Sequence, residues 1–304
     1  MRGFPSRPGT LAGLAALVLA FAVPARATTS PCANVPIVDP QALPCEVAVH
    51  DPVPARPGDD LRVVTFNVHF GADVPALAGA IRSNPELSRA DVLLLQEIES
   101  HPGGDDRAAK LADALNLNLV YAPARIEGDG THGLAILSRY PLSDLEVIRL
   151  KHYDMGLGGF RARRRIAMAA TVHLPDRDVR VYNVHLDTRL TPEERLLQLE
   201  PVVAEAVKQP AALVGGDFNT INAVSSLLPL VPVPVPGFSQ AAGIDAYMRS
   251  KGFATPFERI GRTHHFPMRL DAVYARGLQV EREGKETSVD VSDHFPLWVD
   301  VKVR

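Results

Sequence analysis

The sequence predicts an α/β protein in which two half-sheets pack face to face, each covered by helices on its outer side. Apolar runs typical of strands recur from Leu61 onward, and stretches with helical spacing lie between them. These elements follow the order β-α-β-α, then mostly β, then β-α-β, then more β. No internal repeat or flexible linker divides the 304 residues, so we expect one domain over 61–304.

The first half of that domain is expected to alternate strands and helices. β-Branched residues predict a strand over 61–68, and a run of leucines predicts a buried strand over 91–95. Apolar residues at helical spacing predict helices over 74–82 and 106–115. The segment 119–122 is expected to be extended.

The middle of the domain is predicted to be mainly β-structure, followed by a long helix. Strands are expected over 133–138, 145–150, 166–173 and 179–186. The helix begins after Thr191, because a Thr N-cap is followed by Pro at the first helical position and Glu at the third. Its apolar stripe consists of Leu196, Leu199, Val203 and Val207.

The stretch 211–219 is expected to hold the central strand of the second half. Its apolar start fits a buried strand, and the two glycines that follow allow a sharp turn or a close approach to a ligand. Asp217 and Asn219 are two residues apart, so in an extended chain their side chains share one pocket while Phe218 faces away. After this strand we expect helical turns over 221–228, a Pro-rich apolar loop over 229–238, a helix over 244–251, and strands over 270–274, 278–283 and 297–303.

The N-terminus has the features of a secretory signal. Arg2 and Arg7 precede the apolar run 11–23, which is short for a membrane span, and a small-residue cleavage site ends at Ala27. We therefore expect residues 1–27 to be removed and the protein to be secreted or periplasmic. An uncleaved anchor is the alternative.

The charge balance and the cysteines restrict the possible partners and compartment. The chain has 32 Lys and Arg against 35 Asp and Glu, and loss of the three arginines in 1–27 leaves a net charge of −6. That charge offers no general attraction for a polyanion, so any nucleic-acid binding has to be local. Residues 28–60 are expected to form an N-terminal surface arm, in which Cys32 and Cys45 pair as a disulfide.

Polar side chains recur where the predicted strands end. Strand ends of packed sheets meet at one rim, so these residues are expected to share a pocket although they lie far apart in the sequence. They are Asn67, Glu97, His185, Asp217, Asn219, Asp271, Asp293 and His294.

The chemistry of this set suits a hard divalent cation and a phosphate. Glu97, with Asn67 and Asp293, offers too few oxygen ligands for a closed cage, which fits Mg²⁺ that keeps waters and binds a substrate phosphate. His185 and His294 can donate hydrogen bonds to phosphate oxygens.

The remaining carboxylates suit proton chemistry. Asp271 could hold one imidazole in its working tautomer, and Asp217 with Asn219 could orient and deprotonate a water. Structural alternatives exist, because Glu97 could be an acid at a helix N-terminus and His185 a hydrogen-bonded core histidine.

Seven motifs in this order resemble those of the endonuclease/exonuclease/phosphatase superfamily, the group that resembles pancreatic deoxyribonuclease. They cover the chain from about Leu61 to its end, and together they are far more specific than any one of them. The motifs are Thr65-Phe66-Asn67-Val68, Leu95-Gln96-Glu97-Ile98, Ile136-Leu137-Ser138-Arg139-Tyr140-Pro141, Asn183-Val184-His185-Leu186, Gly216-Asp217-Phe218-Asn219, Arg269-Leu270-Asp271 and Ser292-Asp293-His294-Phe295-Pro296.

The resemblance implies a four-layer α/β/β/α sandwich with two mostly antiparallel sheets, and a Mg²⁺-dependent phosphoesterase, with Mn²⁺ or Ca²⁺ as alternative ions. It implies that Glu97 is the principal metal ligand, with Asn67 beside it and Asp293 as a further metal or pocket carboxylate. By the same resemblance, Asp271 orients His294.

The resemblance also assigns the groups around the phosphate. His185, Asn219 and His294 would contact the scissile phosphate, with Asn67 beside it. Asp217 would position or activate water, or serve a second metal.

Two departures from the superfamily pattern concern histidines. The acid that braces the first catalytic histidine in the pancreatic enzyme is replaced here by His132, which we place in the substrate pocket. Abasic-site endonucleases carry an Asp where this chain has His69, and that difference weakens a DNA-repair function. In the basic run 161–165, Arg161, Arg163 and Arg165 alternate on one face if the segment is extended, so they could grip phosphates beyond the scissile one or belong to a solvated strand end.

The predicted function is hydrolysis of a phosphodiester or phosphomonoester by in-line attack of water. A nuclease would use the basic run, and a phospholipid phosphodiesterase would use the apolar loop 229–238, which could instead cover a helix. A catalytically silent binding module of the same fold is the rival from another class. The expected partner is a phosphate-ester substrate, either nucleic acid or a phospholipid headgroup; we expect a monomer with no stable protein partner.

Overall fold

The computed structural model describes residues 46–48, 60–71, 73–101, 105–153, 163–221 and 239–303. The predicted signal segment, Cys32 and Cys45 lie outside the described residues. So do the turns expected after Ile221 and the Pro-rich loop 229–238. Among the described residues, no helix is long and apolar enough to cross a membrane.

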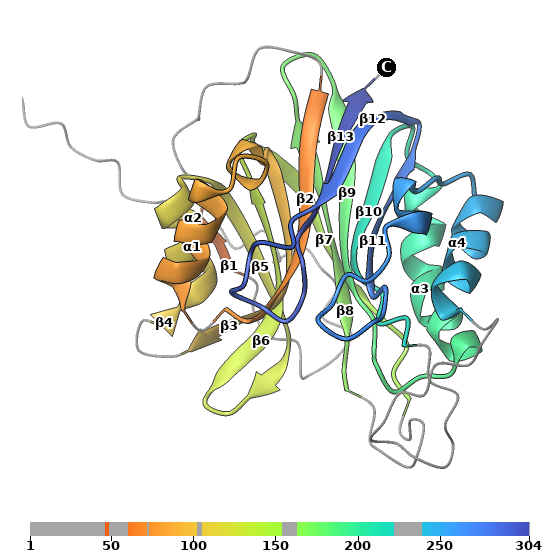
Figure 1. Ribbon diagram of the computed structural model, residues 1–304, viewed down its shortest axis with the longest axis horizontal. Coiled ribbons are helices and arrows are strands. Elements are labelled where there is room, and N and C mark those ends of the chain that lie inside the picture. Colours follow the sequence, from red (N-terminus) through yellow and green to blue (C-terminus); the bar gives the residue numbers. More distant parts are fainter. Residues whose placement is uncertain are drawn as a thin grey trace, which may run out of the picture.

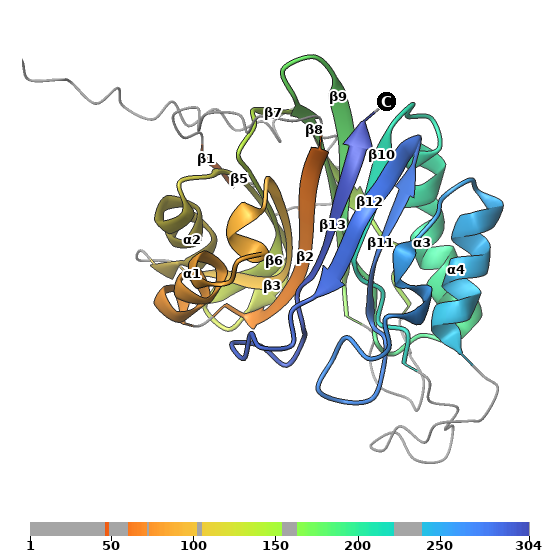
Figure 2. The same ribbon diagram turned by 45° about the horizontal axis from the view of Figure 1, so that its top comes forward.

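Two β-sheets stack face to face and helices cover both outer faces, as Figures 1 and 2 show. One sheet has the order β1 (Glu46–Ala48), β5 (Asn118–Glu127), β6 (Gly130–Ser138), β3 (Val92–His101), β2 (Asp60–Phe70), β13 (Leu297–Val303) and β12 (Leu278–Lys285), and β4 (Asp105–Asp106) pairs with β3. The other has the order β11 (Asp271–Arg276), β10 (Ala212–Asp217), β9 (Asp178–His185), β8 (Ile166–His173) and β7 (Leu142–Arg149). The predicted four-layer α/β/β/α sandwich is confirmed.

The helices are divided between the two faces. α1 (Val74–Ser83) and α2 (Arg107–Leu115) lie on the first sheet, and α3 (Pro192–Ala206) and α4 (Gln240–Ser250) lie on the second (Figure 1). Two short 3-10 helices, η2 (Leu87–Arg89) and η4 (Pro256–Arg259), complete the described helical elements. Thr191 and Glu194 form the predicted capping box of α3.

Each sheet contains one parallel pair of strands joined through a helix. β2 and β3 are parallel around α1, and β9 and β10 are parallel around α3. The other strand pairings in the described part of the chain are antiparallel. Because parallel strands end at the same edge of a sheet, this topology brings the ends of β2 and β3 together, and likewise those of β9 and β10.

Three apolar clusters make up the core. One lies between the sheets, and one lies beneath each helical layer. Within the layer between the sheets, Asn183 of β9 donates to the carbonyls of Leu95 and Ala135, at 2.8 and 2.9 Å. Gln96 of β3 donates to Oδ1 of Asn183 at 2.7 Å. These buried bonds fix the position of one sheet over the other.

Several boundaries differ from the expectations, and the reason is clear for three of them. The arm 28–60 was expected to lack regular structure, but β1 forms there because edge strand β5 offers unpaired main-chain groups, with Val47 opposite Val120. β5 continues past Ala122 to Glu127 because it pairs with β6. α4 begins at Gln240 rather than at Ile244, because Ser239 caps it by accepting from the N–H of Ala242.

We expect Gly216→Ala to destabilise the protein by at least about 3 kcal/mol. Gly216 has φ +150°, and a Cβ there would lie 1.9 Å from the carbonyl oxygen of Val184 on the neighbouring strand. Gly79→Ala in α1 is the matched control, since a Cβ there meets nothing within 4 Å, and it should stabilise by roughly 0.5–1 kcal/mol. Urea denaturation of both variants measures the two changes, and an unaffected Gly216→Ala midpoint would contradict this account.

Candidate active site

A β-bulge places Glu97 at the rim of the first sheet. The pairing of β3 with β6 shifts register between Gln96 and Ile98, and the intervening Glu97 has φ +57°, which is uncommon for a residue other than glycine. Such a bulge redirects the side chain of the extra residue. The Glu97 side chain is 19% exposed and faces the second sheet's strand ends.

Asp217 and Asn219, at the end of β10, lie side by side as expected, but through a turn and not through an extended chain. Asn219 has φ +50°, and its N–H and Nδ2 donate to the two oxygens of Asp217 at 2.8 and 3.2 Å. Nδ2 of Asn67, at the end of β2, donates to Oδ2 of Asp217 at 3.0 Å. A buried carboxylate therefore receives donors from both sheets.

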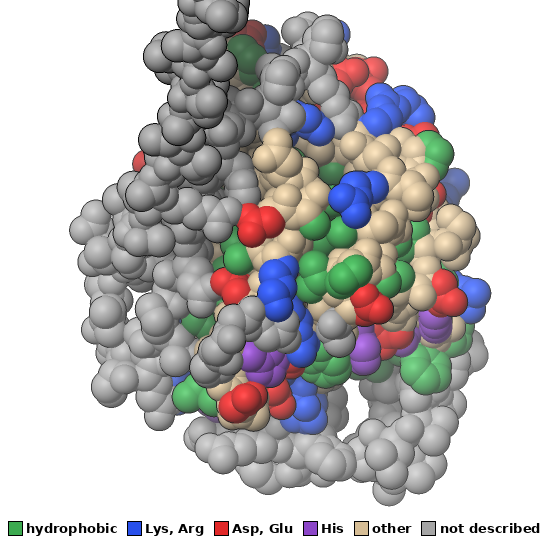
Figure 3. Space-filling model, turned by 90° about the vertical axis from the view of Figure 1, so that its left-hand side faces the viewer, with side chains coloured by type: hydrophobic (Ala, Val, Ile, Leu, Met, Phe, Trp, Pro, Cys, Tyr) green, Lys and Arg blue, Asp and Glu red, His purple; other side chains and the backbone are tan. Residues whose placement is uncertain are grey.

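Three histidines converge on the two carboxylates. Nε2 of His185 lies 3.6 Å from an oxygen of Glu97 and 3.6 Å from Oδ2 of Asp217. Nε2 of His132 lies 3.8 Å from Glu97, and Nε2 of His294 lies 3.9 Å from Asp217. In the space-filling view of Figure 3, the visible histidine side chains lie on the lower part of the face shown, with acidic and basic side chains beside them.

His294 is paired with a carboxylate at its other nitrogen. Its Nδ1 lies 2.9 Å from Oδ2 of Asp271, an oxygen that also accepts from the hydroxyl of Thr263 at 2.7 Å. Burial lowers the pKa of His294, but Asp271 outweighs it and raises that pKa to about 10. The predicted contact between Asp271 and His294 is present.

The pKa of Asp217 is raised as well, but by a different cause. Burial raises its pKa to about 7, even though the nearby His294 acts to lower it. Near neutral pH the site thus holds a carboxylate able to accept a proton beside an imidazolium able to give one. That combination is typical of acid–base catalysis.

His185 is braced by Arg165, which the sequence prediction placed in the basic run 161–165 without linking it to a histidine. Nη1 of Arg165 lies 2.9 Å from Nδ1 of His185, and the Arg165 side chain is buried. Burial, and then the charge of Arg165, lower the pKa of His185 well below its usual value. The alternation of Arg163 and Arg165 before β8 was the available signal.

His132 has an equivalent partner. Nη1 of Arg125 lies 2.9 Å from its Nδ1, so two arginine–histidine pairs flank Glu97. Arg163, in contrast, is exposed, and its hydrogen bond to Asp187 uses the main-chain N–H. The structure does not bring the Arg163 side chain into this cluster, and its role in substrate binding stays a prediction.

Asp293 lies at the outer edge of the site and is 40% exposed. Its oxygens lie 3.4 Å from Nδ1 of His69 and 3.2 Å from Nε2 of His264. Burial raises the pKa of Asp293, but the hydrogen bond from His264 and the charge of His294 lower it to about 2. The sequence analysis assigned no role to His264, because a histidine in a loop does not by itself indicate a site. Its place in the site depends on a main-chain β-bridge to His294, which only the structure shows.

The oxygen donors fit a hard divalent cation. Burial raises the pKa of Glu97, but His132 and His185 lower it further, so the carboxylate is ionised at neutral pH. Asp217 and Asp293 belong to two other groups of the described residues whose ligand atoms lie within 4.8 Å of one another, Asp217 with Asp271 and His294, and Asp293 with His264 and His294; neither group includes Glu97. Asn67 fits less directly, because its Oδ1 already accepts from the N–H of His69 at 3.1 Å. Carboxylate oxygens of this kind match the preference of Mg²⁺.

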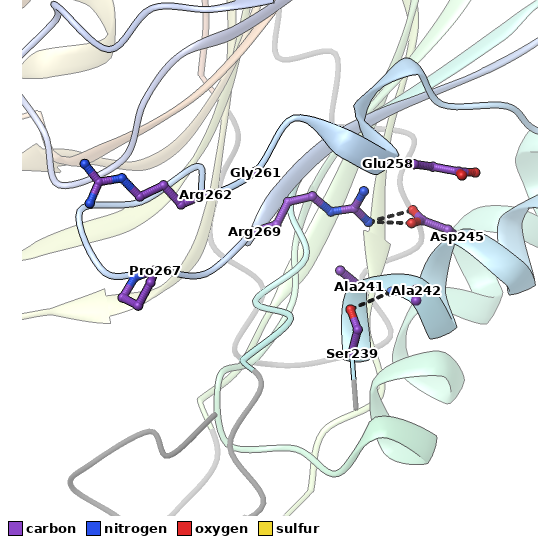
Figure 4. Close-up of a pocket in the computed structure, with 9 residues that line it drawn as sticks. All are labelled: Ser239, Ala241, Ala242, Asp245, Glu258, Gly261, Arg262, Pro267 and Arg269. Atoms are coloured by element: carbon purple, nitrogen blue, oxygen red, sulfur yellow. Dashed lines mark hydrogen bonds and ion pairs between the residues drawn. The ribbon is translucent and has the colours of Figure 1, made fainter. Parts of the chain in front are cut away.

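A separate cavity of about 290 Å³ lies beside α4 and the loop that leads to Arg269. Figure 4 shows that Arg269 makes two hydrogen bonds with Asp245 there, each 2.7 Å long. Its lining contains none of the predicted site residues. The ion pair neutralises this cavity, which is distinct from the carboxylate and histidine cluster.

Comparison with known proteins identifies a matching family, a related sequence and similar solved structures. The model of the Endonuclease/Exonuclease/phosphatase family matches residues 64–294. The chain is 27% identical over 265 residues to Uncharacterized protein YbhP of Escherichia coli (strain K12), covering 79% of this chain and 95% of that protein. Solved structures with the same fold include three that are similar at lower identity.

The first is an endonuclease/exonuclease/phosphatase from Beutenbergia cavernae, with a TM-score of 0.63, 22% identity, and coverage of 81% of this chain and 72% of that one. The second is the human Nocturnin catalytic domain with bound sulfate, with a TM-score of 0.58, 18% identity, and coverage of 84% and 98%. The third is D. rerio TDP2 with a single strand DNA product, with a TM-score of 0.56, 16% identity, and coverage of 80% and 99%. Because the family model spans most of the domain, including both halves of the candidate site, the chain belongs to the endonuclease/exonuclease/phosphatase family.

Proposed function

We propose that this protein is a divalent-metal-dependent phosphoester hydrolase that works by in-line attack of water. Members of its family are generally phosphoester hydrolases. The observation that carries the proposal is that Asp217 and His294 lie close together beside the ionised Glu97. The pKa of Asp217 is raised to about 7 and that of His294 to about 10. Such a pair supplies both a base and an acid near neutral pH.

The residues have different roles because their protonation states differ. Asp217, oriented by Asn219, accepts a proton from the attacking water. His294, charged and held by Asp271, donates from Nε2 toward the phosphate or the leaving group. A Mg²⁺ ion held through Glu97 and Asp293, with Asn67 nearby, would neutralise the charge that develops on the phosphate.

The substrate and the location are further parts of the proposal. We propose a secreted or periplasmic enzyme that acts on a phosphodiester or a phosphomonoester. A nucleic acid is one candidate, supported by the similarity to TDP2 in complex with a DNA product. A phospholipid headgroup is the other. A catalytically silent module fits less well, because Glu97, Asp217, Asn219 and His294 are all retained.

Glu97→Gln and His294→Ala should each lower the rate at least about a hundredfold, because each removes a positioned charged group. Hydrolysis of bis(p-nitrophenyl) phosphate with Mg²⁺, and with EDTA instead, measures the effect. Glu283→Gln, a change at an exposed position on β12, is the matched control. Undiminished turnover by either site variant, or activity that persists in EDTA, would overturn the assignment.

The stabilising effect of the Asp271–His294 pair should depend on pH. The folded pKa of His294, about 10, exceeds its unfolded value of about 6.5. The pair therefore contributes fully below about pH 6.5, and its contribution is lost as the pH rises through about 10. At pH 6, Asp271→Asn should lower the free energy of unfolding by roughly 3 kcal/mol.

That loss should shrink above pH 10, and unfolding of the metal-free protein in urea at the two pH values measures it. Asp290→Asn serves as the control, because Asp290 is 87% exposed. A loss that is equal at both pH values would contradict the assigned charge of His294.

Parallel assays distinguish the two substrates. The protein is incubated with plasmid DNA and, separately, with phosphatidylcholine and sphingomyelin vesicles, in Mg²⁺ and in EDTA. We expect nicking of the plasmid, which the TDP2 similarity favours. Release of phosphorylated headgroups without nicking would replace the nuclease with the phospholipid hydrolase.

A further inference from the structure

The two arginine–histidine pairs determine which nitrogen of each ring carries the hydrogen. A guanidinium has N–H donors and no acceptor. Arg165 lies 2.9 Å from Nδ1 of His185, and Arg125 lies 2.9 Å from Nδ1 of His132. Each Nδ1 must therefore accept, and a neutral ring then carries its hydrogen on Nε2.

We propose that Arg165 and Arg125 are positioning residues that hold His185 and His132 as neutral rings whose Nε2–H groups face the reaction centre. The two rings act as fixed hydrogen-bond donors to an anionic substrate, and neither transfers a proton nor binds a metal through Nε2. This inference rests on the proposed function. It assigns a role to Arg125, which the sequence prediction did not use, and gives Arg165 a role other than the phosphate contact considered for the basic run.

The unpaired groups around Glu97 support this role. Six buried side-chain nitrogens in the described part of the chain have no hydrogen-bond partner. Four of them belong to the two arginine–histidine pairs, namely Nε2 of His132, Nε2 of His185, Nη2 of Arg125 and Nε of Arg165, and the other two are Nε of Arg139 and Nδ1 of His152. Buried donors without partners are costly, and their concentration in one place is typical of a site that receives an anion. The distances of 3.6–3.8 Å from the two Nε2 atoms to Glu97 exceed hydrogen-bond length.

Each arginine is itself held in place. Nε of Arg125 donates to Glu127 at 2.7 Å, which orients its guanidinium toward His132. Arg165 is 5% exposed and is stabilised by the charges of Glu97 and Asp187. A fixed guanidinium orients a ring better than a mobile side chain can, because little freedom remains to be lost on substrate binding.

His294 shows what the opposite partner does. Its Nδ1 faces the carboxylate of Asp271, so that nitrogen donates and the ring can hold a second hydrogen on Nε2. A second hydrogen on His185 would instead point at an N–H of Arg165. Proton transfer therefore belongs to His294, and His185 contributes hydrogen bonding alone.

Nitrogen NMR tests the inference without requiring turnover. Long-range ¹H–¹⁵N correlations of the metal-free, substrate-free protein, labelled with ¹⁵N-histidine, identify the protonated nitrogen of each ring. We expect His185 and His132 to carry hydrogen on Nε2 only, with assignments from His185→Gln and His132→Gln. His264 is the internal control, because its Nδ1 accepts from the main-chain N–H of Phe266 at 2.9 Å.

Two substitutions separate positioning from folding. Arg165→Met removes the donor, so the His185 signals should shift toward a mixture of tautomers while those of His132 stay unchanged. Hydrolysis should fall about tenfold to a hundredfold, since a misplaced group costs that much. Arg165→Lys keeps a donor and should restore the Nε2–H form and part of the rate. Arg259→Met, at an exposed position in η4 outside the basic run, is the control.

The outcomes are distinct. Wild-type His185 found with hydrogen on Nδ1 overturns the inference, and so does an unchanged tautomer in Arg165→Met. If Arg165→Met does not fold, Arg125→Met and the His132 signals decide in the same way. The expected tautomers in a protein that hydrolyses no phosphoester would refute the proposed function and leave the tautomer assignment intact.

Discussion

The hydrogen bonds between the two sheets are the constraint on which the site depends. Asn183 lies in an apolar layer and bonds to main-chain carbonyls of β3 and β6, while Gln96 bonds back to it. Sliding one sheet over the other would leave these groups unpaired away from water, at a cost of about 1–3 kcal/mol for each. The offset between the sheets is thereby set, and Glu97 of one sheet lies beside Asp217 of the other.

The low polarity of this junction, where Glu97 and Asp217 meet, then influences the protonation state of each titratable group. Burial makes Asp217 a weaker acid, whereas the same burial leaves Glu97 ionised because two histidines face it. His185 and His294 are the same residue type, yet an arginine beside one and a carboxylate beside the other give them different charges. Because both rings are buried, the partner at Nδ1 is what distinguishes the two imidazoles.

Local irregularities of the backbone place two of the candidate site residues at that junction. Glu97 stands on a bulge with positive φ, and Asn219 also has positive φ just after β10. Both conformations are unfavourable for residues other than glycine. They persist because the surrounding strands and the bonds to Asp217 hold the chain in place.

Much of the fold was predictable from sequence pattern. The strand before Asp217, the capped start of α3 and the two βα units follow from short-range periodicity and end signals, which depend on neighbours in the chain. The convergence of polar strand ends was predictable too, because parallel strands of one unit end at the same edge. β1 was not, because an edge strand adds a segment through its main chain and needs little of the segment's own sequence.

The sequence by itself determined which elements form and which carboxylates, amides and imidazoles stand at their ends, since both depend on local pattern. Only the tertiary structure decided which groups pair across those ends. Arg165 joins His185 and His264 joins Asp293 through contacts between distant segments, which leave no periodic trace in the chain. The charge on each ring followed from those pairings, because a donor and an acceptor at the same nitrogen favour opposite protonation states.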